Sequence, residues 1–152
     1  MTTYAVLLTG DETAWERMTP EQQAEVFGKH EEFARLLAER GHQLSGGQEL
    51  TPSATTKKIT KDAAGAVTVT DGPYTESVEQ LGAFYLVDTD DLADLLEISA
   101  VLAETDGAIE ARAVADHADA RHHLRESPAV TASTQVAYSV GAVADHGDET
   151  GA

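Results

Sequence analysis

The chain has 152 residues, 41% of them hydrophobic, and no cysteine, which excludes disulfide scaffolds, thiol catalysis and cysteine-based zinc sites. Its 27 acidic residues outnumber its 10 basic ones, so the formal net charge is −17. Such an acidic surface repels phosphate backbones and anionic lipids, and we expect neither a nucleic-acid partner nor a membrane partner.

The chain opens with a short apolar run over residues 2–8, which predicts a strand. No basic residue precedes the run, and it is too short to span a bilayer, so it is typical neither of a signal peptide nor of a membrane anchor. We therefore expect a cytoplasmic protein. Residues 9–18 follow as a predicted loop.

The first helix has clear signals at both of its ends. Thr19 as N-cap, Pro20 at the first helical position and Gln22 three residues after the cap form a capping box. The helix is expected to run to about Arg40, where Gly41 supplies the glycine that ends many helices.

The rest of the first 115 residues alternates between strand and helix signals. The predicted elements are a strand with a Gly-Gly bend at 42–50, a hairpin at 54–71, a central strand at 81–88, a helix from about Thr89 or Asp90 to 104, and a last strand at 108–114. This order predicts an α+β, ferredoxin-like fold: a mostly antiparallel sheet with two helices on one face. The other face would stay exposed in a monomer, so we expect a homodimer with the packing of a dimeric α+β barrel.

Residues 116–152 differ in character from residues 1–115, and we expect them to form a C-terminal extension with a short helix, a strand and an acidic end. The alternation of residues 130–140 predicts a strand that pairs with a sheet edge, preferably that of a partner copy. Asp119 lies three and four residues before His122 and His123, which on a helix suits either a metal pair or a solvated amphipathic face. Two ligands make no site, and we expect no metal and no other cofactor.

Two motifs give the chain a family resemblance. They are "GGQELTPSATTKKI" at 46–59 and "TDGPYTESVEQLGAFYLVD" at 70–88. In this order and spacing they resemble the YCII-related family, in the branch marked by a DGPF motif. The chain departs from that branch at Tyr74, Val78 and Ala83, where Phe, Lys and Gly are usual.

His30 is the leading candidate for chemistry. At about 100° per residue it falls in the middle of the apolar side of the first helix, so its imidazole must find a partner. One interpretation is a structural histidine with a satisfied hydrogen bond. The family resemblance implies another, an acid–base pair of His30 with Asp106, because His30 stands eleven residues before Gly41 and Asp106 lies between the second helix and the last strand.

Other residues are candidates for a binding pocket. Asp71 opens a turn at 71–73. Either this is a rigid turn that aims the next strand, or Asp71 lines a pocket mouth together with Tyr74 and Glu76. Ser45 is either a pocket hydroxyl or a residue at a strand end. The expected walls of the pocket are Trp15, Phe27, Tyr74 and Tyr85.

Three functions remain open at this point. The first is a lyase- or hydrolase-type enzyme that acts on a small-molecule ligand by proton transfer through His30 and Asp106. The second is a non-catalytic ligand-binding or regulatory protein that acts through a protein partner. The third is a structural subunit.

Overall fold

The structure is a computed structural model that describes residues 1–72, 79–103 and 107–116. The described residues form β1 (Thr2–Asp11), α1 (Glu12–Arg17), α2 (Pro20–Glu39), β2 (Gln43–Glu49), the 3-10 helix η1 (Ser53–Thr55), β3 (Lys57–Lys61), β4 (Val67–Asp71), β5 (Glu79–Thr89), α3 (Leu92–Ala103) and β6 (Ala108–Ala113). Within these ranges, none of the helices is long and apolar enough to cross a membrane.

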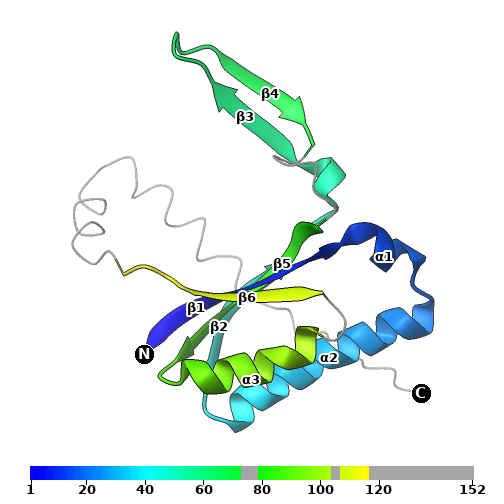
Figure 1. Ribbon diagram of the computed structural model, residues 1–152, viewed down its shortest axis with the longest axis vertical. Coiled ribbons are helices and arrows are strands. Elements are labelled where there is room, and N and C mark those ends of the chain that lie inside the picture. Colours follow the sequence, from blue (N-terminus) through cyan, green and yellow to red (C-terminus); the bar gives the residue numbers. More distant parts are fainter. Residues whose placement is uncertain (73–78, 104–106, 117–152) are drawn as a thin grey trace, which may run out of the picture. The chain divides into compact units, whose positions relative to one another are not determined.

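The main sheet has four strands in the order β2-β5-β1-β6, and every neighbouring pair is antiparallel. The long helices α2 and α3 lie side by side along one face of this sheet (Figure 1). β3 and β4 form a separate two-stranded hairpin between β2 and β5 in the sequence. The predicted α+β, ferredoxin-like architecture with two helices on one face is therefore confirmed.

The hydrophobic core lies between that face and the helices. It consists of Val6 and Leu8 of β1, Val87 of β5, Phe33 and Leu37 of α2, and Leu95, Ile98 and Leu102 of α3. The strand residues alternate and the helix residues recur every three or four positions, as burial of one face requires. β5 is paired on both sides, and Tyr85, Val87 and Thr89 are the alternate residues that it directs toward the helices.

The structure confirms the capping box and the helix-ending glycine predicted for α2. The Thr19 hydroxyl accepts a hydrogen bond from the Gln22 N–H at 3.2 Å, and the Gln22 side chain accepts one from the Thr19 N–H at 2.9 Å. At the other end, Gly41 has a φ of 82°, and the His42 N–H donates to the Leu37 carbonyl at 2.9 Å. This is the Schellman arrangement, in which a left-handed glycine lets the chain leave the helix.

Two local predictions were wrong. Residues 9–18 are not a loop, because β1 extends to Asp11 and α1 follows directly. The Asp11 carboxylate caps α1 by accepting from the Thr13 N–H at 2.9 Å and the Thr13 hydroxyl at 2.7 Å, and these bonds lower the Asp11 pKa. The side chain that caps α3 belongs to Asp91, which accepts from the Asp94 N–H at 3.0 Å, and not to Thr89 or Asp90.

His42 joins three elements through a hydrogen-bond network that the sequence did not reveal. Its side chain is 4% exposed, with Nδ1 lying 2.7 Å from the Thr89 hydroxyl and Nε2 lying 2.7 Å from the Asp94 carboxylate. Arg40 donates to the same carboxylate. The hydrogen bond with His42, followed by the one with Arg40, holds the pKa of Asp94 below its ordinary value. The network ties the end of α2 to α3 and to the end of β5.

The lowered pKa predicts how stability depends on pH. The unfolded chain binds a proton at Asp94 at a higher pH than the folded chain does, so the stabilisation by this carboxylate is complete above about pH 4 and is lost below it. Asp94→Asn should therefore lose less of its free energy of unfolding than wild type between about pH 6 and about pH 3 in urea titrations.

The exposed Glu49→Gln serves as the control, because it also removes one carboxylate but not this network. It should keep the wild-type pH dependence. Equal losses in Asp94→Asn and wild type would show that the network does not contribute to acid stability.

Candidate active site

The centre of the candidate site is a hydrogen bond between His30 of α2 and Tyr85 of β5. His30 Nδ1 lies 2.6 Å from the Tyr85 hydroxyl, and the two ring centroids are 5.9 Å apart. Both side chains are partly buried at the boundary between helix and sheet. The imidazole on the apolar side of α2 therefore has the polar partner that its position demands.

The Tyr85 ring has two close neighbours. Phe33 packs against it with a centroid separation of 5.0 Å. Gly47 of β2 also lies close to it: an added Cβ there would come within 2.8 Å of Tyr85 Cδ1 and 2.7 Å of the Phe84 carbonyl oxygen. The second glycine of the Gly-Gly motif thus lets β2 pass close to Tyr85, and the ring is fixed where its hydroxyl reaches His30.

A second aromatic pair lies one helical turn away from His30. Phe27 precedes His30 by three residues on α2, and its ring meets that of Trp15 edge to face with centroids 5.5 Å apart. Phe27, one of the expected pocket walls, is 54% exposed. It is therefore a surface residue that can contact a ligand.

The remaining predicted site residues are not joined to this pair by the contacts of the described residues. The Ser45 hydroxyl donates to the Leu86 carbonyl at 3.2 Å, beside an irregularity in the pairing of β2 with β5. Asp71 ends β4 and forms an ion pair with Lys57 across the hairpin. Tyr74, Glu76 and Asp106 lie outside the described residues, so the His30–Asp106 pair stays a prediction.

Glu12 is a residue that the sequence analysis missed. Its carboxylate accepts a hydrogen bond from the Ser53 N–H at 2.7 Å and another from the Ser53 hydroxyl at 2.6 Å. These bonds join η1, which lies within the motif at 46–59, to α1, the helix that carries Trp15. The sequence signal was weak, because 41 residues separate the partners.

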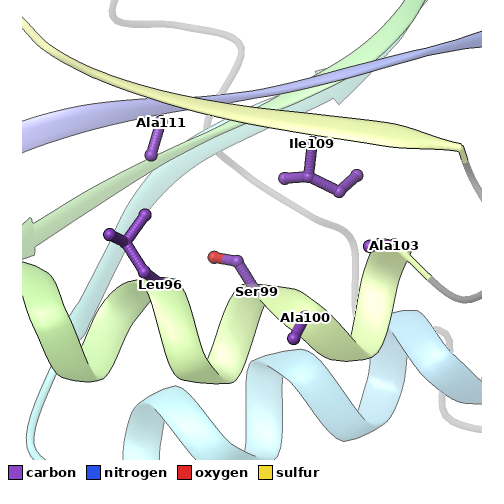
Figure 2. Close-up of a pocket in the computed structure, with 6 residues that line it drawn as sticks. All are labelled: Leu96, Ser99, Ala100, Ala103, Ile109 and Ala111. Carbon is purple, nitrogen blue, oxygen red and sulfur yellow. The ribbon is translucent and has the colours of Figure 1, made fainter.

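His30 lines neither of two hollows that lie among the described residues. One, of about 130 Å³, lies between α3 and β6 (Figure 2). It is lined by Leu96, Ser99, Ala100, Ala103, Ile109 and Ala111, which are mostly small and apolar. The other, of about 380 Å³, lies near η1 and is lined by Leu50, Thr51, Ser53, Thr55, Thr56, Gln80 and Leu81. Within the described ranges, no three His, Asp or Glu side chains gather as metal ligands would.

The fold defines the class of protein: an α+β domain with a ferredoxin-like sheet, in which a helix and a central strand bring a histidine and a tyrosine together. The family model described as "YCII-related domain" matches residues 2–142. A protein described as "Uncharacterized protein R00369", of Rhizobium meliloti (strain 1021), is 31% identical over 115 residues, covering 74% of this chain and 91% of that protein. The chain belongs to the YCII-related family, as the two motifs predicted.

The family match extends past Ala115, into the segment predicted to be a separate extension. The division of the chain into residues 1–115 and 116–152 stays a prediction, because the helix and strand expected in the second part lie outside the described residues.

The contact between Gly47 and Tyr85 generates a prediction for this site. In Gly47→Ala the new methyl group must displace the Tyr85 ring or β2, so we expect a loss of about 1–3 kcal/mol in the free energy of unfolding and a changed His30 imidazole signal in NMR spectra.

Gly28→Ala is the matched control for this variant. Its Cβ meets nothing within 4 Å, and alanine favours helix, so its stability should be unchanged or higher by up to about 1 kcal/mol. A Gly47→Ala protein with wild-type stability and an unmoved His30 signal would show that the glycine does not position Tyr85.

Proposed function

We propose that this YCII-related protein binds a small molecule beside the His30–Tyr85 pair and transforms it by proton transfer, in a lyase- or hydrolase-type reaction. The observation that carries the proposal is the 2.6 Å contact between an imidazole nitrogen and a phenol hydroxyl, both only partly buried. An imidazole titrates near neutral pH and can take up or release a proton there.

The hydrogen bond limits how the proton can move. Because Tyr85 holds Nδ1, the carboxylate of Asp106 in the proposed acid–base pair would act on Nε2. A proton exchanged with substrate would then pass through the Tyr85 hydroxyl, which hands it to His30 or receives it from His30. In this scheme Asp106 stabilises the protonated imidazole, and Tyr85 is the group that touches the substrate.

The surrounding aromatic residues support a small organic ligand. The exposed Phe27 ring and its neighbour Trp15 offer apolar faces one helical turn from His30. In the proposal these rings bind the apolar part of the ligand, and Tyr74 and Asp71 of the DGPF-type motif border the same proposed binding site. Ser45 is left out of the proposal, because its hydroxyl donates to the Leu86 carbonyl.

A homodimer completes the proposal. The sheet face opposite the helices presents partly exposed apolar side chains, with Leu7 directly opposite Phe84 in the register of β1 and β5. Packing this face against that of a second copy would bury both, as in a dimeric α+β barrel.

The alternative is a ligand-binding or regulatory protein without catalysis. It uses the same aromatic residues but requires no proton transfer. The two functions differ in what a His30 variant would lose: the enzyme loses turnover, whereas the binding protein keeps its ligand.

Substitution of the pair tests the catalytic function. In a substrate screen, His30→Ala should lower any turnover by about 10²–10⁴-fold while the circular dichroism spectrum stays native. Tyr85→Phe should lower turnover by a similar factor if the hydroxyl carries the proton.

Glu31→Gln, an exposed substitution at the next position of α2, should retain full activity. If His30→Ala turns over substrate at the wild-type rate, His30 has no place in the mechanism. If the wild-type protein and all variants bind a ligand but none of them turns it over, the non-catalytic binding function is favoured.

A further inference from the structure

The β3–β4 hairpin carries an apolar face that the rest of the described chain leaves exposed. Within the described chain, β3 and β4 pair with each other and with no strand of the main sheet. Ile59 lies opposite Val69 and Lys61 opposite Val67, so the three β-branched residues share one face of the hairpin.

These three side chains are unusually exposed. Ile59 is 69%, Val67 61% and Val69 60% exposed, more than any other large hydrophobic residue of the described chain except Met1. An isolated two-stranded hairpin is at best marginally stable in water and needs a surface to pack against. A gathered, exposed apolar face of this kind marks an interaction site.

The charge of the hairpin indicates its partner. Residues 57–71 contain three of the chain's ten basic residues but only two of its 27 acidic ones. Lys57 is paired with Asp71, Lys61 lies on the same face as the three β-branched residues, and Lys58 lies on the opposite face. The hairpin is therefore a slightly basic segment on a strongly acidic chain, and it complements the surface of another copy of that chain.

We propose that the Ile59–Val67–Val69 face docks onto a second copy of this chain, with Lys61, which shares that face, against that copy's carboxylates. The two-fold symmetry of a homodimer makes the contact reciprocal, so each hairpin packs on the other protomer. This inference rests on the proposed homodimer and adds that the β3–β4 hairpin forms part of its interface.

Sedimentation equilibrium of the full chain tests whether the β3–β4 hairpin contributes to the dimer. Ile59→Thr/Val69→Thr keeps the strand propensity but removes the apolar contact, and it should raise the dimer Kd by at least about tenfold. Lys61→Glu keeps all three apolar side chains and should also weaken the dimer, most strongly at low salt.

Thr60→Ser/Thr68→Ser on the opposite face of the same strands is the control and should leave the dimer Kd unchanged. A dimer that responds to neither the apolar nor the charge variant contradicts the inference but leaves the homodimer standing. A monomeric wild-type protein contradicts both.

A crosslinking experiment on the wild-type chain needs no variant. Carbodiimide joins a lysine directly to a carboxylate, and an equal mixture of ¹⁴N- and ¹⁵N-labelled protein distinguishes links between copies from links within one copy. We expect mixed-isotope pairs that contain Lys61. Same-isotope pairs alone, or lysines that link only to a different protein added from a lysate, overturn the proposal.

Discussion

The register of β5 is the constraint on which the rest of the structure depends. Its backbone is hydrogen-bonded to β1 on one side and β2 on the other, so its side chains have no freedom to change faces. Toward the helices it presents Tyr85 for the candidate site, Val87 for the core and Thr89 for the His42 network. A slip of one residue would turn all three to the opposite face, and site, core and helix anchor would be lost together.

Gly47 belongs to the family motif at 46–59 and lies beside Tyr85 of β5. Its missing side chain leaves room for the Tyr85 ring, against which Phe33 also packs. The site is thus positioned by backbone geometry and core packing, with His30 supplied by the helix above. Glu12 fastens η1 of the same motif to α1. Gly47 and η1, which both belong to the motif at 46–59, therefore have structural roles, in addition to the roles proposed for His30 and Tyr85 in chemistry.

The sequence predicts the features that depend on neighbouring residues. Three such features are the capping box at Thr19, the helix-ending glycine at Gly41 and the apolar run of β5. Each depends on residues only a few positions apart, and the order of the elements predicts the fold. The candidate site is predicted only in part. His30 follows from helical periodicity, but its bond to Tyr85 spans 55 residues. His42 was missed because its partners lie 47 and 52 residues away.

The central claim, that a small molecule binds at the His30–Tyr85 pair, is tested most directly by a fragment screen in solution. Protein labelled at its histidine and tyrosine rings would report each contact by NMR. The account predicts that bound fragments shift the signals of His30 and Tyr85 together, and that Tyr85→Phe weakens their binding. Fragments that bind while both signals stay unmoved, for example in the hollow between α3 and β6, would contradict it.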